Sequence, residues 1–314
     1  MKTVVYLGPG EALNTAREIL EPTLKVVAPE INDGAVARSL VDAVAIIDAS
    51  MKTNFDREML EKAPGLRVIS TATTGADHID SKVLAERGIP LFTLAGQKDV
   101  LHNLTPAAEL SWMLLMASAR KLRGAVKHVL DGKWVREEFP GVMLKDKTLG
   151  LIGCGRIGSW MARYALAFGM EVIGFDPFVS SWPENIRKSD LDSLLSAADF
   201  VSIHVPLNEQ TRKMIGFREF ALMKNGVILI NTSRGAIMDE NAFLNALVQG
   251  RIGASGVDVL EGEPEINHHP LVEYARTHDN LIITPHVGGF SLDAVRTVVA
   301  YASRRALKLL DETQ

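Results

Sequence analysis

Residues Leu149–Asp176 read LGLIGCGRIGSWMARYALAFGMEVIGFD, and this stretch decides the fold. An apolar strand is followed by the turn Gly153-x-Gly155-x-x-Gly158, a helix, a second apolar strand and an acid. In such a turn the first glycine permits the bend, the second lets the backbone approach a pyrophosphate, and the third lets helix and strand pack closely. The helix N-terminus offers unpaired N–H groups to the phosphates, and Asp176 can accept hydrogen bonds from ribose hydroxyls. The stretch therefore predicts a dinucleotide-binding domain.

The composition bounds the class of protein. A chain of 314 residues is too long for one hydrophobic core and suits two domains. Its net charge of −4 argues against a nucleic-acid partner, and no apolar run approaches the length of a membrane span. The single cysteine, Cys154, cannot form an intrachain disulfide, so a reducing cytoplasm is the expected location.

Strand and helix signals also alternate in the first hundred residues. Short β-branched runs such as Val4–Leu7 and Val44–Ile47 are separated by helix-like segments, which indicates a small parallel sheet covered by helices. This region lacks a glycine fingerprint and is expected to bind the substrate. A final helix over Leu292–Leu310 has one apolar face that can pack back on it.

We therefore predict an α/β fold with two Rossmann-like or flavodoxin-like domains, parallel sheets covered by helices, and a cleft between them. Residues 1–100 with 290–314 are expected to form a discontinuous substrate domain. Residues 101–289 are expected to form the dinucleotide-binding domain.

One helix in the second region is unusually apolar. Thr105 as N-cap and Pro106 at the first helical position mark its start, and the apolar stretch covers Ala107–Ala119. Such a helix either crosses between domains or packs on a second subunit. Together with the segment Gly132–Trp134, it offers more apolar surface than a monomer tolerates, which predicts a homodimer.

Three later strands end in polar segments that contain Arg234, Glu263 and His286. In open parallel sheets the ligand crevice lies beyond the carboxyl ends of the strands, so these residues are expected beside the dinucleotide. An Arg can hold a carboxylate through two parallel hydrogen bonds, and a His can move a proton near neutral pH. A Glu can orient that His and stabilise its charge.

The order of motifs resembles the D-isomer-specific 2-hydroxyacid dehydrogenase family over nearly the whole chain. Family members are two-domain enzymes with a discontinuous layout, and they dimerise through the region of the apolar helix. The matching pieces are Thr74–Asp80, Asn103–Glu109, Gly132–Trp134, Lys147–Gly150 with the fingerprint, His204–Leu207, Ile230–Gly235, Val257–Val259 and Pro285–Gly288.

The resemblance implies a role for each matching residue. Arg234, Glu263 and His286 would be the catalytic trio, and Arg234 and His286 would also bind the substrate. The turn at Thr74, Gly75 and Ala76 would bind the substrate carboxylate, and no metal is implied. The implied cofactor contacts are Gly153, Gly155, Arg156, Ile157, Gly158, Asp176, His204, Val205, Pro206, Thr232, Ser233 and Asp258.

The predicted activity is NAD-dependent, reversible oxidation of a small D-2-hydroxy acid to the 2-oxo acid. The substrate stays open between the phosphoglycerate dehydrogenase branch and glyoxylate or hydroxypyruvate reductases. Ala49 stands where the first branch usually has Arg, with Lys52 as an alternative cation. An alternative hypothesis is that the protein is not an enzyme but an NAD-sensing, corepressor-like interaction protein on the same fold. The lack of a peptide-docking extension disfavours this hypothesis.

Other polar residues receive a structural interpretation. His204 is interpreted as a wall of the cofactor pocket rather than a proton carrier. His268 and His269 are interpreted as part of a solvated loop, and His78, which replaces a common family Asn, is given no chemistry. The segment Arg187-Lys188 is taken as surface charge, which leaves Asp176 to favour NAD over NADP.

Overall fold

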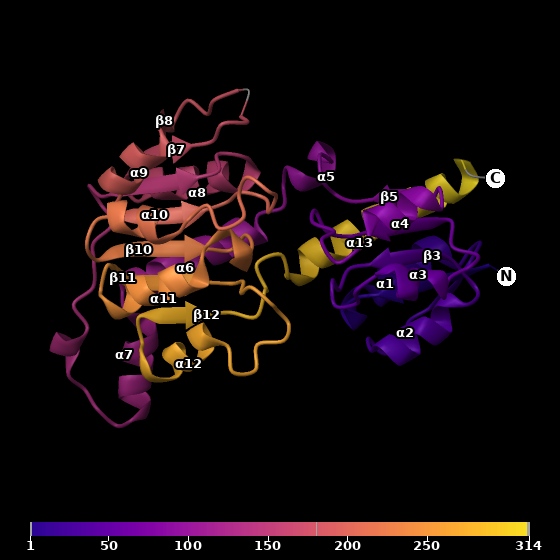
Figure 1. The fold of residues 1–314 in the computed structure, drawn as a ribbon, viewed down its shortest axis with the longest axis horizontal. Coiled ribbons are helices and arrows are strands. Elements are labelled where there is room, and N and C mark those ends of the chain that lie inside the picture. Colours follow the sequence, from indigo (N-terminus) through magenta and orange to yellow (C-terminus); the bar gives the residue numbers. More distant parts are fainter. Residues whose placement is uncertain (1, 180, 313–314) are drawn as a thin grey trace. The chain divides into compact units, whose positions relative to one another are not determined.

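The computed structural model describes residues 2–179 and 181–312. The chain divides into two compact units, Met1–Leu104 with Phe290–Gln314, and Thr105–Gly289 (Figure 1). Each unit contains one parallel sheet with helices on both faces, which confirms the predicted α/β fold class. None of the helices within the described ranges is long and apolar enough to cross a membrane.

The first unit has a five-stranded sheet with the order β2-β1-β3-β4-β5. Its strands are β1 (Thr3–Leu7), β2 (Lys25–Val27), β3 (Ala43–Asp48), β4 (Val68–Thr71) and β5 (Leu91–Phe92). One apolar layer lies under α1 (Gly10–Leu20) and α13 (Leu292–Glu312). The opposite layer lies under α2 (Asp33–Leu40), α3 (Arg57–Glu61) and α4 (Ser81–Glu86), and the short α5 (Lys98–Leu101) follows β5.

The last helix, α13, completes the core of the first unit. Val295, Val299 and Ala302 on its apolar face are buried together with β-strand and α1 residues. The Ser70 hydroxyl on β4 donates a hydrogen bond to the Ala302 carbonyl oxygen (2.9 Å). The amphipathic pattern of this helix is therefore explained by its packing against a sheet that lies more than 200 residues earlier in the chain.

The second unit has a seven-stranded parallel sheet with the order β12-β11-β10-β9-β6-β7-β8. Its strands are β6 (Thr148–Ile152), β7 (Glu171–Phe175), β8 (Arg187–Lys188), β9 (Phe200–Ile203), β10 (Val227–Asn231), β11 (Ile252–Val257) and β12 (Leu281–Ile283). The strand order reverses between β6 and β9, which is the switch point at which such sheets bind ligands.

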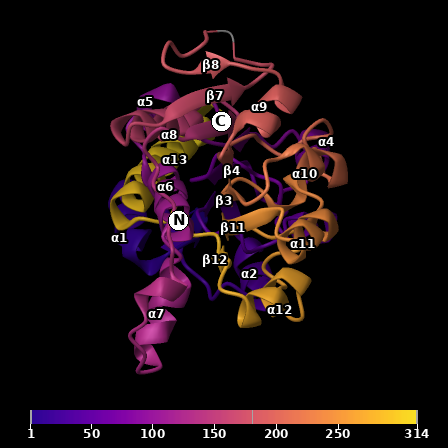
Figure 2. The same cartoon turned by 90° about the vertical axis from the view of Figure 1, so that its left-hand side faces the viewer.

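Helices cover both faces of this sheet (Figures 1 and 2). One face carries α9 (Leu191–Ala197), α10 (Phe217–Leu222), α11 (Glu240–Val248) and α12 (Pro270–Thr277), and the other carries α6 (Pro106–Ala119) and α8 (Arg156–Ala167). Helix α7 (Leu122–Leu130) projects from the body of the unit in Figure 2 and leads into the 3-10 turn η1 (Arg136–Glu138).

The apolar helix α6 differs from its prediction in two ways. Its apolar character comes mainly from burial inside the second unit, where Leu114 and Leu115 pack under β10, β11 and α8. Thr105 occupies the N-cap position but has helical backbone angles, and its side chain caps no backbone N–H. The Thr105 hydroxyl instead donates to the Glu109 carboxylate (2.5 Å). Exposed apolar side chains gather further along, on α7 and the segment after it.

Candidate functional site

The glycine turn between β6 and α8 has the geometry that the fingerprint predicts. Gly153 has a φ of +95°, and a Cβ there would lie 2.4 Å from the His204 carbonyl oxygen. A Cβ on Gly158 would lie 2.1 Å from the Gly153 carbonyl oxygen, so helix and turn touch through backbone alone. Gly155 meets nothing within 4 Å, which leaves open space at the N-terminus of α8. The turn therefore fits a pyrophosphate on the helix N-terminus.

Asp176 follows β7 and lies beside this turn. Its Oδ2 accepts a hydrogen bond from the Cys154 N–H (2.9 Å), and its Oδ1 accepts from the N–H groups of Phe178 (2.9 Å) and Val179 (3.1 Å). The carboxylate also lines a surface pocket of about 720 Å³. Since Oδ2 accepts only one of these three hydrogen bonds, it keeps a second lone pair with which Asp176 can accept from a ribose hydroxyl in that pocket.

The same pocket is lined by Arg187 and Lys188, which form the two-residue strand β8. β8 pairs with β7, with Arg187 opposite Ile173 and Lys188 opposite Gly174. Both cations are exposed, as predicted, but the pairing brings them to the pocket of Asp176. The Lys188 ammonium lies over the Trp182 ring, 5.5 Å from its centroid. Their distance from Asp176 in the sequence did not indicate this proximity, because β8 is too short and too polar to be recognised as a strand of the sheet.

The cofactor contacts implied around β9 and β10 also follow strand ends. His204, Val205 and Pro206 come after β9, and the Val205 side chain borders Gly153. After β10, the Thr232 and Ser111 hydroxyls are hydrogen-bonded (2.7 Å), and Ser233 donates to the Ile203 carbonyl oxygen (2.7 Å). Arg156 and Ile157 are the first two residues of α8, and burial lowers the pKa of the Arg156 guanidinium.

His204 is unsuited to carrying protons. Its Nε2 is hydrogen-bonded to the Ser202 hydroxyl (2.8 Å), and its buried Nδ1 has no partner among the described residues. Burial lowers the pKa of His204 to about 3, so the imidazole is neutral at physiological pH.

His286 and Glu263 form a direct pair. β12 and β11 are neighbours in the sheet, and the residues after their carboxyl ends lie at the same edge. His286 Nδ1 is 2.5 Å from Glu263 Oε1, and the side chains are 34% and 30% exposed. A carboxylate on Nδ1 fixes the imidazole tautomer and leaves Nε2 as the nitrogen that can exchange a proton with a ligand. The pair has the composition and exposure of a proton-transfer group.

Asp258 anchors the segment that carries His286. The buried Asp258 carboxylate accepts hydrogen bonds from the Thr284 hydroxyl (2.5 Å) and from the N–H groups of Val287 (2.9 Å) and Gly288 (2.7 Å). The His286 N–H donates to the Asp258 carbonyl oxygen (2.9 Å). Burial raises the pKa of Asp258 in spite of these donors. Resemblance implied a cofactor contact here, and the anchoring of the His286 segment was not foreseen.

Arg234 follows β10, which lies on the other side of β11. The Asn231 amide donates to the Arg234 carbonyl oxygen (2.9 Å), and Arg234 Nη1 donates to the Ser233 carbonyl oxygen (2.8 Å). A Cβ on Gly235 would lie 2.2 Å from the Glu261 backbone nitrogen. The backbone beyond Arg234 therefore touches the segment that carries Glu263, and the three residues at these strand ends come from adjoining segments of one unit.

Thr74, Gly75 and Ala76 lie in the first unit, in a turn after β4. The Thr73 hydroxyl donates to the Gly75 carbonyl oxygen (2.7 Å), while the Gly75 and Ala76 N–H groups meet no acceptor in the part of the chain that the structure describes. Such N–H groups can bind an anion.

A buried pair that the sequence did not signal fixes this turn. His78 Nε2 lies 2.6 Å from Oδ2 of Asp48, which is fully buried at the end of β3. Asp48 Oδ1 accepts hydrogen bonds from the Ser50 N–H and hydroxyl (both 2.9 Å). His78, given no chemistry above, thus ties the turn after β4 to the one after β3.

The interpretation of the His268-His269 segment is half right. His268 is exposed, but His269 is only 10% exposed, and its Nε2 pairs with Glu240 Oε2 (2.9 Å). The His269 Nδ1 accepts the Leu271 N–H (3.3 Å) and caps α12. Within residues 2–179 and 181–312, no three His, Cys, Asp or Glu side chains form a group that could hold a metal ion.

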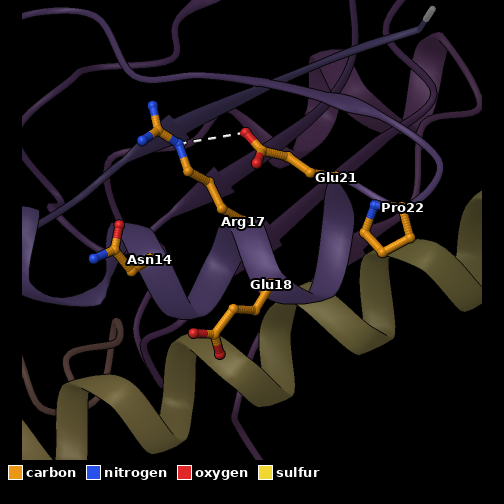
Figure 3. Close-up of a pocket in the computed structure, with 5 residues that line it drawn as sticks. All are labelled: Asn14, Arg17, Glu18, Glu21 and Pro22. Atoms are coloured by element: carbon orange, nitrogen blue, oxygen red, sulfur yellow. Dashed lines mark ion pairs between the residues drawn. The ribbon is translucent and has the colours of Figure 1, made fainter.

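A second surface pocket lies on α1 in the first unit (Figure 3). It measures about 540 Å³ and is lined by Asn14, Arg17, Glu18, Glu21 and Pro22, with Arg17 and Glu21 in an ion pair (3.4 Å). It contains none of the residues singled out from the sequence.

The fold and the glycine turn define a dinucleotide-binding protein. Residues 112–288 match the NAD binding domain of D-isomer specific 2-hydroxyacid dehydrogenases, and residues 11–158 match the catalytic domain of the same family. The chain therefore belongs to the D-isomer specific 2-hydroxyacid dehydrogenase family, as its motifs predicted, and NAD is confirmed as the cofactor.

Individual relatives carry the names of different dehydrogenases. The chain is 36% identical to a D-3-phosphoglycerate dehydrogenase of Methanocaldococcus jannaschii, over 93% of this chain and 55% of the relative. It is 37% identical to a hydroxypyruvate reductase of Thermotoga maritima, over 82% of each chain. It is 38% identical to a glyoxylate reductase of Thermococcus litoralis, over 81% of this chain and 78% of the relative. The chain thus spans about half the length of the phosphoglycerate dehydrogenase it matches.

Solved structures agree with this family. A Thermus thermophilus protein is 34% identical, with a TM-score of 0.85 over 99% of this chain and 97% of that one. The D-lactate dehydrogenase of Aquifex aeolicus, solved with NAD and lactic acid, is 26% identical, with a TM-score of 0.84 over 99% and 96%. The corepressor alternative gains no support from these comparisons.

Proposed function

We propose that this protein is an NAD-dependent dehydrogenase that interconverts a small D-2-hydroxy acid and its 2-oxo acid. The observation that carries the proposal is the 2.5 Å contact between His286 Nδ1 and Glu263 Oε1, in the same unit as a turn shaped for a dinucleotide. A carbonyl reduction needs a proton donor, and this pair supplies an imidazole whose orientation and tautomer are fixed by a carboxylate.

The residues have distinct proposed roles. Bound NAD(H) supplies the hydride. In the reduction His286 gives the proton from Nε2 to the forming hydroxyl oxygen, and in the oxidation Nε2 takes it back. Glu263 accepts a hydrogen bond from the other ring nitrogen and so fixes the tautomer and orientation of the imidazole. Arg234 holds the substrate carboxylate by two parallel hydrogen bonds.

The substrate class follows from this set of donors and from the relatives. A guanidinium such as that of Arg234 suits a carboxylate next to the reacting carbonyl. The names of the relatives include phosphoglycerate dehydrogenase, hydroxypyruvate reductase and glyoxylate reductase, all of which concern small 2-oxo or 2-hydroxy acids. Glyoxylate, hydroxypyruvate and phosphohydroxypyruvate are therefore the first compounds to test. Lys52, in the turn after β3, is the candidate cation for a phosphate, since Ala49 provides none.

The proposal is tested by NADH consumption with a panel of 2-oxo acids. We expect saturable oxidation of NADH with at least one acid that contains two to four carbon atoms. Aldehydes and ketones of matched size without a carboxylate serve as controls and are expected to be inactive. Absence of activity over the whole panel, in a protein that still binds NADH, would contradict the proposed function.

Arg234→Lys is expected to lower kcat/KM for the 2-oxo acid by roughly 10- to 100-fold, the equivalent of ~1.5–3 kcal/mol for one lost charged hydrogen bond. The ammonium keeps the charge but cannot reproduce the planar two-point grip on a carboxylate. Steady-state kinetics with NADH at saturation measure the effect. Arg276→Lys, an exposed residue of the same unit, is the matched control. Wild-type kinetics in Arg234→Lys would show that another cation holds the carboxylate.

The protein is expected to be a homodimer in solution. Exposed apolar side chains gather on α7 and the segment after it, including Leu130, Trp134 (87% exposed) and Met143. This segment folds back on α7, because the Val135 N–H donates to Nε2 of the buried His128 (3.0 Å). An ordered apolar surface of this kind marks a protein contact. The region that supports the dimer is thus α7 and this segment rather than α6.

Light scattering at micromolar concentration measures the mass. We expect twice the chain mass for the wild type and a shift toward monomer for a variant with Leu130→Asp and Trp134→Asp. A monomeric wild type would refute the dimer.

A further inference from the structure

Glu240, the first residue of α11, contacts the loop that carries Glu263. Glu240 Oε1 accepts a hydrogen bond from the Glu261 N–H (2.8 Å), two residues before Glu263. Glu240 Oε2 pairs with His269 Nε2 (2.9 Å), six residues after Glu263. Glu240 therefore grips the Glu263 loop on both sides.

The pair between Glu240 and His269 is largely shielded from solvent, and His269 is the donor in it. The two side chains are only 15% and 10% exposed. His269 Nδ1 accepts the Leu271 N–H (3.3 Å), so Nε2 carries the proton and donates it to Glu240. Burial raises the pKa of Glu240, and a carboxylate held away from water needs such donors.

The surrounding charges belong to the same network. The Glu261 carboxylate lies 3.5 Å from Arg212 Nη1 and 4.0 Å from Lys213 Nζ. Lys213 Nζ is also 3.8 Å from the Asp239 carboxylate. These side chains are more exposed than Glu240 and His269, so they are expected to contribute less to the order of the loop.

Because of its position in the chain, Glu240 links two of the segments that carry the candidate catalytic residues. Glu240 lies six residues after Arg234, on the segment that follows β10, whereas Glu263 lies on the segment that follows β11. A shift of the Glu263 loop would lengthen its 2.5 Å contact with His286. A displacement of about 1 Å in a catalytic group can cost ~10²-fold in rate.

We propose that Glu240 and His269 are positioning residues, which hold the Glu263 loop in register so that Glu263 reaches His286; this inference rests on the proposed function. Neither residue touches the substrate. Their effect on the reaction passes through Glu263 alone.

His269→Asn is the first test. Asn is a favoured N-cap, so the variant keeps the cap on α12 while its shorter side chain cannot reach Glu240. Glu240→Gln is the second, because an amide has only one acceptor oxygen and so cannot accept from both the Glu261 N–H and His269 Nε2–H. Each variant is expected to lower kcat by roughly 10- to 100-fold with little change in KM for NADH. His268→Asn is the matched control, since this neighbour is exposed and has a φ of +62° that Asn tolerates.

A double-mutant cycle with Glu263→Gln separates positioning from general destabilisation. If Glu240 and His269 act only through Glu263, either change should lower kcat by less than about twofold in the Glu263→Gln background. If the two residues only stabilised the fold, each change would lower kcat by the same factor in the wild-type and the Glu263→Gln backgrounds, so that the losses would be additive. Additive losses, or wild-type kcat in both single variants, would overturn the proposal.

Hydrogen exchange supplies a readout that does not need activity. Amides of residues 259–267 should exchange faster in His269→Asn and Glu240→Gln than in the wild type and in His268→Asn. Unchanged exchange would overturn the proposed grip even if the wild type reduced no 2-oxo acid. Faster exchange with an inactive wild type would contradict the proposed function while leaving the grip itself supported.

Discussion

His286→Ala is expected to lower kcat by ~10²–10⁴-fold, the usual contribution of a positioned proton donor. The imidazole pairs with Glu263 through Nδ1, and this leaves Nε2 as the nitrogen that exchanges the proton. His204, the other histidine at these strand ends, cannot replace it, because burial keeps it neutral with a pKa of about 3. The measurement is steady-state reduction of the best 2-oxo acid at saturating NADH.

NADH binding is the control for this variant. His286 follows β12, whereas the glycine turn lies between β6 and α8, so fluorescence titration with NADH should give a dissociation constant close to that of the wild type. His268→Asn should retain wild-type turnover. Unchanged turnover in His286→Ala would remove this residue from the proposed mechanism.

A preference for NADH over NADPH of ~100-fold in kcat/KM is the second large effect, at about 1.4 kcal/mol per decade. The Asp176 carboxylate accepts from the Cys154 N–H in the glycine turn, so it is fixed where ribose hydroxyls would lie. A 2′-phosphate would bring like charge to the same position. Kinetics with both cofactors under identical conditions measure the ratio, and equal efficiency would show that Asp176 does not face the ribose.

Asp176→Ala separates the acid from the two cations that share its pocket. Arg187 and Lys188 line this pocket and can attract a phosphate once the carboxylate is removed. We therefore expect the variant to lose most of its preference for NADH, chiefly by a gain with NADPH. Adding Arg187→Ala and Lys188→Ala should abolish that gain. An NADH preference that survives Asp176→Ala would mean that the shape of the pocket, rather than charge, selects the cofactor.

Much of the fold and of the candidate site could be predicted because the signals are local. Short apolar strands with β-branched residues indicate each sheet. The spacing of three glycines within six residues is enough to predict the geometry of the glycine turn. Arg234, Glu263 and His286 follow three strands that the sheet places side by side. Their meeting at one edge follows from parallel strand order alone.

The features that escaped prediction depend on pairings without a local pattern. β8 is a two-residue polar strand, so nothing in its sequence indicated that it would pair with β7. Glu240 and His269 are 29 residues apart, and their contact forms only when α11 and α12 lie on the same face of the sheet. The apolar sequence of α6 suggested an interface, but burial inside a single unit requires the same composition.

The most direct test of the central claim is the enantiomer that the protein oxidises. Wild-type protein is incubated with NAD and, separately, with the D and L forms of a hydroxy acid. The acid chosen is the one whose 2-oxo acid was the best substrate of three or more carbon atoms in the NADH panel, because the product of glyoxylate reduction is achiral. Formation of NADH is followed at saturating NAD. We predict oxidation of the D form, no detectable oxidation of the L form, and loss of the D activity in His286→Ala. Oxidation of the L form, or of neither, would contradict the account.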